Sequence, residues 1–472
     1  MKLFQTLFTS SILTASIVSA ATLGSLIKLQ ETGSRANRIN IAMVAEGYTS
    51  SSADSLKFIA DLGKMQAAIF SDPVLKRYST YFNFYGIYVK SAQSGADADN
   101  ITSDADCATQ TKSVKDTYFG AYYCASNIQR LLVANGSLAN TVALGHVPEA
   151  QVVAVLVNSS IYGGSGGSIS VANSGAPEII AHEVGHSFVS LKDEYDYTAG
   201  YTPTEGINAT AITDRSTIKW KNWVLASTPL PTAETSANNA LVGAFEGANY
   251  RATGWFRPMN NCRMKSNGVD LCSICAEAWV LKVYQKVSTI DSSTTPGNFA
   301  WNNQSTISVK PMQPQSGGSL SVKWYLDNTY KSSGNTFLGP ISAGAHSLKA
   351  IVTDTSSVVR TDPQQLLKDS VVWNITSTAT STLEPEKNIL VSQKLGQLEF
   401  VDPRGMSFSI PHGQQATFSV LNSQGQIHFK NEIQGDGNLH FVSWPKELHH
   451  GMWIVQAQFE NSTSVQKTFF LE

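Results

Sequence analysis

Hydrophobic residues near the start of the chain follow first the spacing of a strand and then that of a helix. Residues 39–44 are apolar except for Asn40 and predict a buried strand ending at Gly47. Residues 53–70 have apolar positions at helical intervals. The expected buried positions of this helix are Leu56, Ile59, Leu62, Met65 and Ile69. A strand followed by a helix is the usual beginning of an α/β layer.

Three later segments continue this pattern. Residues 82–89 alternate aromatic and aliphatic side chains and predict a second strand, whereas residues 127–135 have the spacing of a helix. Residues 151–157 form a near-continuous apolar run, which is typical of a strand buried on both faces. We therefore expect one α/β (α+β) domain that extends over residues 21–290.

Beyond residue 290 the pattern becomes that of an all-β protein. Short segments alternate with period two between turns of Gly, Ser and Asn, and predict a β-sandwich of immunoglobulin size over residues 291–376. Residues 377–388 are rich in Ser and Thr, cannot form a core, and predict a linker. Alternating segments in residues 389–472 predict a second small β module. The expected fold is thus an α/β domain followed by two all-β sandwich modules.

The N-terminus has the features of a targeting signal. Lys2 precedes a mostly apolar stretch, residues 3–18, and small residues at Ser19 and Ala20 provide a cleavage site. A short membrane anchor is the alternative, but the stretch is shorter than the ~20 strongly apolar residues that a spanning helix needs. We expect residues 1–20 to be a signal peptide and the mature chain to be secreted, without a membrane span.

Composition excludes a nucleic-acid partner but agrees with an extracellular surface. Charged residues make up 15% of the 472 residues and the net charge is −2, so the chain has no basic field for a polyanion. An average soluble chain has roughly 25% charged residues.

Five cysteines suggest disulfide bonds in such a compartment. Cys107 and Cys124 are expected to close a small loop, and Cys262 is expected to pair with Cys272 or Cys275. A zinc site made from the last three cysteines is the alternative. No nearby histidine supplies a fourth ligand, which favours the disulfide.

The strongest chemical signal is the sequence His-Glu-Val-Gly-His at residues 182–186. Residues four apart lie on one face of a helix, so His182 and His186 can bind one tetrahedral zinc ion. Zinc polarises a carbonyl and lowers the pKa of its bound water toward about 7, and Glu183 is placed to take the proton from that water. Such short matches also arise by chance on solvated helices. Here the preceding strand, the glycine-rich turn at residues 162–167 and the apolar neighbour Ile179 indicate a buried helix instead.

A peptidase site of this kind needs a third protein ligand, which we assign to Asp193. On a continuous helix Asp193 would lie roughly 10 Å beyond His186, too far to share an ion. The chain must therefore turn back near Ser190 or Leu191. Glu194 is the alternative ligand; if Asp193 binds the metal, Glu194 is expected to orient a histidine ring.

Together these stretches resemble the IgA-peptidase-like family of zinc metallopeptidases. Matching segments follow one another in order at residues 44–49, 156–158, 162–164, 182–188, 193–195, 219–223, 245–247 and 257–264. They cover about residues 38–285. One departure is Val189, which stands where the longer zincin pattern has the glycine that makes the turn easy.

The resemblance implies a metzincin-like, or zincin-like, catalytic domain that acts on a protein or peptide substrate, which need not be immunoglobulin A. It also implies that Met264 forms the floor beneath the zinc; an ordinary core methionine is the alternative. The last module is similar to C-terminal sorting domains of bacterial outer-membrane secretion, with a plain adhesion module as the alternative. Either would attach the protein to a cell surface.

The sequence therefore predicts a secreted zinc-dependent endopeptidase. One catalytic zinc ion is expected on His182, His186 and Asp193, with Glu183 as the general base. The main alternative is a catalytically silent binding or adhesion protein with a zincin-like domain, and a third hypothesis is a deamidase or glycan hydrolase that uses the same site. Glu183 favours an enzyme, because metal binding alone does not require a base.

Overall fold

The computed structural model describes residues 24–98, 105–108, 111–197, 202–302, 305–315 and 320–378, together with the strands of the last 74 residues, 399–472. The chain divides into two compact units, Met1–Thr380 and Ser381–Glu472, and each is described by itself. The predicted signal peptide and nearly all of the predicted linker lie outside the described residues. Within the described part, no helix combines the length and apolarity needed to cross a membrane.

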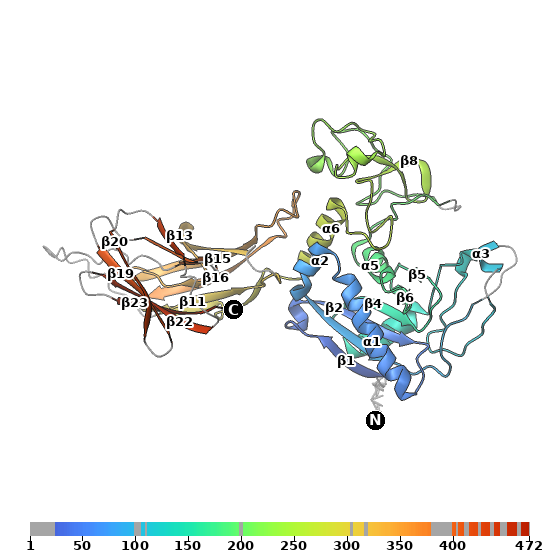
Figure 1. Cartoon of the computed structure of the whole chain (residues 1–472), viewed down its shortest axis with the longest axis horizontal. Helices are drawn as coiled ribbons and strands as arrows, with labels where there is room; N and C mark the ends of the chain where they lie inside the picture. Colours follow the sequence, from blue (N-terminus) through green and yellow to red (C-terminus); the bar gives the residue numbers. More distant parts are fainter. Residues whose placement is uncertain are drawn as a thin grey trace, which may run out of the picture. The chain divides into compact units, whose positions relative to one another are not determined.

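A six-stranded mixed sheet forms the centre of the α/β part of the first unit (Figure 1), with the strand order β1-β3-β2-β4-β6-β5. Its strands are β1 (Ser25–Gln30), β2 (Ile39–Glu46), β3 (Phe82–Tyr88), β4 (Ala150–Val157), β5 (Gly164–Ser165) and β6 (Ser170–Asn173). The four inner strands are parallel, whereas the edge strands β1 and β5 are antiparallel to their neighbours. All three strands predicted for this region, at residues 39–44, 82–89 and 151–157, are confirmed.

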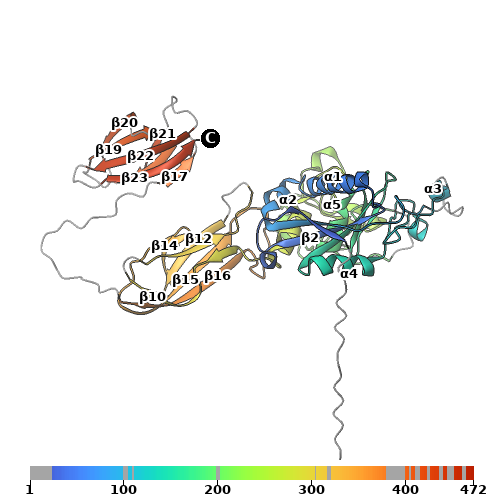
Figure 2. The ribbon, with the colours of Figure 1, turned by 90° about the horizontal axis from the view of Figure 1, so that it is seen from below.

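Both faces of this sheet are covered, because alternate residues of β2 enter separate cores. Ile41 and Met43 pack in the core that includes α1 (Ser52–Ile69). Ala42 and Val44 pack in the core that includes α4 (Gly136–His146). Figure 2 shows α1 and α4 on opposite sides of β2. Burial of both faces explains why these strands are continuous apolar runs in the sequence.

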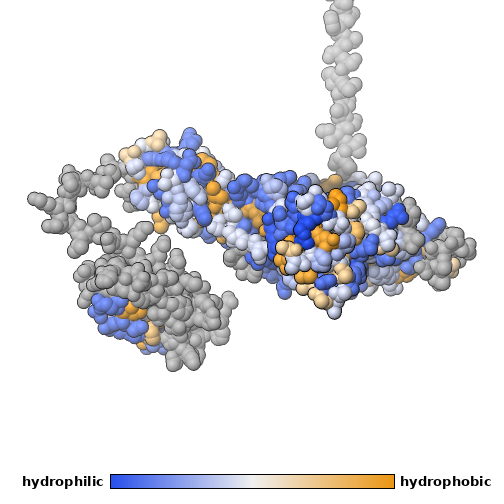
Figure 3. Space-filling view, turned by 90° about the horizontal axis from the view of Figure 1, so that it is seen from above, coloured by the Kyte–Doolittle hydropathy of each residue, from blue (hydrophilic) through white to orange (hydrophobic). Residues whose placement is uncertain are grey.

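The helix predicted at residues 53–70 is α1, and its buried face agrees with the prediction at Leu62, Met65 and Ile69 but not at Leu56 and Ile59. Its buried apolar residues are Phe58, Leu62, Met65 and Ile69. Leu56 is 70% exposed and Ile59 is 42% exposed. Single exposed hydrophobic residues are ordinary on a protein surface. On the face shown in Figure 3, hydrophobic residues are interspersed with hydrophilic ones.

The prediction of a helix at residues 127–135 is wrong. Leu131 forms a β-bridge with Gly164, and Val133 forms one with Tyr122. The helix in this region, α4, begins at Gly136, because the side chain of Asn135 caps it by accepting a hydrogen bond from the N–H of Leu138. The segment before Asn135 thus covers the outer edge of β5.

A β-sandwich follows and completes the first unit. One sheet has the order β10-β16-β15-β12-β13 and the other has the order β14-β11-β9. The strands are β9 (Ile290–Ser293), β10 (Gly297–Trp301), β11 (Ile307–Pro311), β12 (Leu320–Leu326), β13 (Thr329–Ser333), β14 (Thr336–Phe337), β15 (Gly344–Asp354) and β16 (Lys368–Ser377). Trp301, Trp324 and Trp373 are buried in its core.

Buried hydrogen bonds join the sandwich to the α/β part. At the end of β15, Asp354 Oδ2 accepts hydrogen bonds from Tyr78 Oη (2.6 Å) and Tyr284 Oη (2.8 Å). Glu277, on helix α6 (Ser273–Tyr284), accepts hydrogen bonds from the N–H groups of Arg360 (2.6 Å) and Thr361 (2.8 Å) in the loop after β15. These contacts explain why the first unit extends beyond the α/β domain to include the sandwich.

The second unit contains only strands among its described residues. A three-stranded sheet has the order β17-β18-β21 and a four-stranded sheet has the order β20-β19-β22-β23. The strands are β17 (Glu399–Asp402), β18 (Gly405–Ser409), β19 (Gln415–Asn422), β20 (Ile427–Gln434), β21 (Leu439–Ser443), β22 (Gly451–Phe459) and β23 (Ser464–Leu471). Neighbouring strands are antiparallel throughout these sheets. The chain is therefore a mixed α/β domain followed by β modules.

Replacing Asp354 with Ala should loosen the junction between the α/β part and the sandwich. The substitution removes the acceptor of two buried tyrosine hydroxyls, so the free energy of unfolding should fall by about 2–3 kcal/mol. Asp369→Ala is the matched control, because that carboxylate is exposed on the same sandwich and should change stability by less than about 0.5 kcal/mol. Urea denaturation measures both. Equal losses in the two variants would contradict a stabilising junction.

Candidate active site

The His-Glu-Val-Gly-His segment lies on a buried helix that ends in a sharp turn. Helix α5 (Ile179–Val184) is buried throughout and continues as one π-helical turn, Gly185–Val189. Ser190 then adopts a left-handed conformation, with φ +65°, which ends the helix. A non-glycine residue in this conformation costs about 1 kcal/mol. The turn required by the sequence spacing thus occurs at Ser190, without the glycine of the longer zincin pattern.

This turn brings three of the predicted residues together. His182 Nε2 lies 3.0 Å from His186 Nε2, and Asp193 Oδ1 lies 3.0 Å from the first nitrogen and 3.3 Å from the second. Ligands bound tetrahedrally to zinc at 2.0–2.1 Å are separated from one another by roughly 3.3 Å. The three donor atoms therefore have the spacing of ligands to one shared ion.

Backbone carbonyls orient both imidazoles. His182 Nδ1 lies 3.0 Å from the carbonyl oxygen of Arg263, and His186 Nδ1 lies 2.7 Å from that of Leu191. A carbonyl oxygen can only accept a hydrogen bond, so each Nδ1 carries the proton. In the neutral rings, each Nε2 then directs its lone pair toward Asp193 Oδ1. A positive charge between these three lone pairs, supplied by a proton or by a metal ion, stabilises the arrangement.

The charges of the cluster lead to the same conclusion. Burial alone would lower the pKa of His186, but the adjacent Asp193 carboxylate raises it to about 9. Burial alone would raise the pKa of Asp193, but the two imidazoles hold it well below its usual range. Asp193 is therefore an anion that attracts a positive charge to the histidine pair.

A hairpin distant in sequence fixes the Asp193 carboxylate. Strands β7 (Phe245–Ala248) and β8 (Arg251–Arg257) are joined by Asn249 and Tyr250, which both have positive φ (56° and 64°). The N–H of Asn249 donates to the carbonyl oxygen of Asp193 (2.8 Å), and Tyr250 Oη donates to Asp193 Oδ2. Oδ2 is thereby engaged, and Oδ1 is left facing the histidines. Sequence reasoning missed Tyr250; its only signal was a bulky residue at a hairpin position that favours glycine.

Glu183 lies against the glycine-rich edge strand. A Cβ atom at Gly164 would lie 3.1 Å from Glu183 Oε1, and one at Gly166 would lie 3.1 Å from Glu183 Oε2. Burial raises the pKa of Glu183 above its usual range, although the neighbouring His182 and His186 oppose this. The absence of side chains at these two glycines thus makes room for the carboxylate.

Met264 lies beneath the histidine helix. Its side chain is fully buried, and its Sδ atom would lie 2.9 Å from a Cβ placed on Gly185. Its carbonyl oxygen accepts a hydrogen bond from the N–H of Glu194 (2.8 Å). Met264 therefore packs against the helical turn between the two histidines, where a floor residue would lie.

An open cleft of about 960 Å³ leads to these residues. His182, Glu183, His186 and Asp193 all line it. Arg130 also lines the cleft, and its guanidinium lies over the rings of Tyr195 (5.7 Å) and Tyr197 (4.7 Å).

Two expectations about neighbouring residues are corrected. Glu194 orients neither histidine, because backbone carbonyls occupy both Nδ1 positions and Glu194 points instead toward three cysteines. The disulfide expected at Cys262 is absent: Cys262, Cys272 and Cys275 are free and buried, because their side chains converge with Glu194 instead of pairing. The disulfide between Cys107 and Cys124 is present as predicted.

The close packing of the edge strand predicts contrasting effects at two adjacent glycines. Gly166→Ala would place its Cβ 2.5 Å from the Cβ of His186, so it should lower the free energy of unfolding by about 1–3 kcal/mol. Gly167→Ala has no atom within 4 Å of its Cβ and should leave stability unchanged or raise it by up to about 1 kcal/mol. Urea denaturation measures both. Similar effects of the two substitutions would rule out close packing as the reason for glycine at position 166.

Solved structures similar to parts of the chain are distant. They include β-glucuronidase from Parabacteroides merdae, with 8% identity, a TM-score of 0.13 and coverage of 46% of this chain and 29% of that one. Fibronectin(III)-like modules of CbhA from Clostridium thermocellum have 15% identity, a TM-score of 0.14 and coverage of 39% and 93%. The chain thus spans less than a third of the β-glucuronidase. No curated protein sequence matches the chain.

The sequence profile of one peptidase family covers the α/β domain. The family is described as IgA peptidase M64, and its profile matches residues 27–239 and 233–283. These two segments overlap and together include most of β1, all of β2 to β8 and most of α6, as well as all the residues that line the cleft. More than half of the chain is therefore matched, and the protein belongs to the IgA peptidase M64 family.

Proposed function

We propose that this protein is a secreted zinc-dependent endopeptidase with a zincin-like catalytic domain. The observation that supports this most strongly is the convergence of two histidine nitrogens and one carboxylate oxygen, 3.0–3.3 Å apart, on the wall of an open cleft. Membership of a peptidase family supports the reaction class. The adjacent Glu183 supports catalysis over metal binding alone.

The donor set suits zinc. Two neutral imidazoles and one carboxylate form a three-ligand set that leaves a fourth position for substrate or water. His182, His186 and Asp193 would hold the ion, and Tyr250 would keep Asp193 bound through one oxygen. When bound, zinc supplies Lewis acidity, which polarises the scissile carbonyl and lowers the pKa of water toward about 7.

Glu183 is the proposed general base. It accepts the proton of the attacking water and later donates that proton to the leaving amine. Burial raises its pKa, which makes its carboxylate a better proton acceptor than an exposed glutamate. Gly164 and Gly166 leave room for this carboxylate, which lines the cleft. The cleft of about 960 Å³ is large enough for a short stretch of peptide.

Secretion and surface attachment are part of the same proposal. The predicted signal peptide and the Cys107–Cys124 disulfide both favour an oxidising, extracellular compartment. The proposed organisation is a catalytic domain over residues 21–290, a sandwich over 291–376, a linker over 377–388 and a terminal module over 389–472. We propose that the terminal module serves in sorting or adhesion and takes no part in hydrolysis.

Glu183→Gln should abolish most of the turnover without removing the metal. The amide is similar in size but cannot accept a proton, so kcat on a peptide substrate should fall by at least about 100-fold. Zinc content and the free energy of unfolding should remain those of the wild type, since the metal ligands are untouched. A Glu183→Gln variant with near-wild-type kcat would mean that another group is the base.

Asp193→Ala should weaken zinc binding at the cleft. With only two histidines left, the affinity should fall by more than the roughly 100-fold that loss of a supporting hydrogen bond causes. Asp196→Ala is the matched control, because this carboxylate is exposed and close in sequence. Competition with a chromophoric chelator gives both affinities. Unchanged affinity in Asp193→Ala would exclude this residue as the third ligand.

A further inference from the structure

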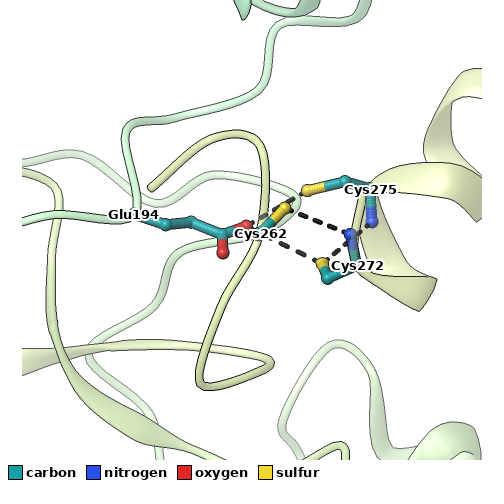
Figure 4. A group of neighbouring side chains, drawn as sticks. All are labelled: Glu194, Cys262, Cys272 and Cys275. Atoms are coloured by element: carbon teal, nitrogen blue, oxygen red, sulfur yellow. Dashed lines mark hydrogen bonds between the residues drawn. The ribbon is translucent and has the colours of Figure 1, made fainter. Parts of the chain in front are cut away.

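A second group of metal-ligating side chains lies apart from the cleft. It consists of Glu194, Cys262, Cys272 and Cys275, whose ligand atoms all lie within 4.8 Å of one another. All four residues are buried. Figure 4 shows their side chains pointing toward one another from three separate segments of the chain. None of them lines the cleft, so the proposed peptidase chemistry does not account for them.

Backbone N–H groups point at the sulfurs of two of the cysteines, Cys262 and Cys272. Cys272 is the N-cap of α6, a helix of 12 residues, and Cys275 lies in its first turn. The N–H of Cys272 donates to Cys262 Sγ (3.2 Å), and the N–H of Cys275 donates to Cys272 Sγ (3.5 Å). Backbone donors and the positive end of a helix both stabilise negative charge on sulfur. Thiolates are the form in which cysteine binds metals.

Glu194 supplies a fourth possible ligand, and one of its carboxylate oxygens is not hydrogen-bonded within the described residues. Its Oε1 atom accepts hydrogen bonds from Asn208 Nδ2 (2.8 Å) and Cys275 Sγ (3.1 Å). Its buried Oε2 atom has no hydrogen-bond partner among the described residues. Leaving a buried acceptor unsatisfied costs about 1–3 kcal/mol. A cation held between the carboxylate and the three sulfurs would remove this cost.

We propose that Glu194, Cys262, Cys272 and Cys275 hold a second, structural zinc ion. Cys272 and Cys275 have the two-residue spacing common in structural zinc sites, and four protein ligands complete a tetrahedron with no position for water. Three thiolates select zinc over magnesium or calcium, which prefer oxygen ligands. The site therefore takes a thiophilic divalent ion and has no catalytic part.

A disulfide fits this arrangement less well. Pairing Cys262 with Cys272 or Cys275 would leave the third cysteine unpaired and Glu194 Oε2 still without a hydrogen-bond partner among the described residues. A buried oxygen without a partner is unfavourable. Zinc uses all four side chains at once.

The second ion would brace the first site, since the two sites share two chain segments. Glu194 follows Asp193 directly, and its N–H donates to the carbonyl oxygen of Met264 (2.8 Å). Cys262 directly precedes Arg263, whose carbonyl oxygen orients His182. An ion that joins Glu194 to Cys262 therefore fixes the two segments that position Asp193 and His182.

Metal and thiol counts on the full chain test this proposal. The protein is equilibrated with excess Zn²⁺, freed of unbound ion by gel filtration and analysed by mass spectrometry. Wild type should retain two zinc ions, one for each group, and the double variant His182→Ala/His186→Ala should retain one. Cys275→Ser should also retain one, whereas Ser273→Ala, at a neighbouring position without a ligand, should retain two.

A second measurement tests the proposal even if Cys275→Ser does not fold. Wild type unfolded in chelator without reductant should give three reactive thiols, because only Cys107 and Cys124 are paired. With cobalt in place of zinc, the double histidine variant should show thiolate-to-metal charge-transfer absorption. One reactive thiol, no zinc in the double histidine variant, or a cobalt spectrum without that absorption would each overturn the proposal. If the cleft alone failed to bind zinc, the three reactive thiols, the single zinc ion of the double histidine variant and its cobalt absorption would all remain.

Discussion

The candidate site depends on three lone pairs that face one another across about 3 Å. Neither imidazole can turn away, because each Nδ1 is hydrogen-bonded to a backbone carbonyl, and Asp193 cannot turn away because Tyr250 and Asn249 hold it. A cation between these donors relieves the repulsion. Other parts of the fold serve to enforce this convergence: the left-handed turn at Ser190, the β7–β8 hairpin and the edge strand that packs against the helix.

Strands, helices and site residues could be predicted where neighbouring residues in the sequence carried the signal. Strands buried on both faces were predictable because their apolar runs are continuous, and the histidine pair was predictable because helical spacing places both residues on one face. The helix predicted at residues 127–135 was wrong because pairing of Leu131 with Gly164 outweighed a short helical pattern. Tyr250 could not be predicted, since it reaches Asp193 only through a hairpin from a distant segment.

The cysteine cluster illustrates the same limit. In the sequence, Cys262, Cys272 and Cys275 have no histidine nearby that could serve as a fourth ligand. The fold supplies Glu194 instead, from the turn after the histidine helix, and backbone N–H groups donate to the sulfurs of Cys262 and Cys272. Asp193 and Glu194 thus point to different clusters, which explains how two adjacent acids can have separate roles.

Hydrolysis of casein by the purified mature chain is the most direct test of the proposed chemistry. The rate is measured as isolated, after removal of metal with a chelator, and after return of stoichiometric zinc. If the convergent donors hold a catalytic zinc ion, hydrolysis should disappear with the metal and return with zinc. Hydrolysis that persists in the metal-free protein, or that is absent from the fully zinc-loaded protein, would contradict the proposed function.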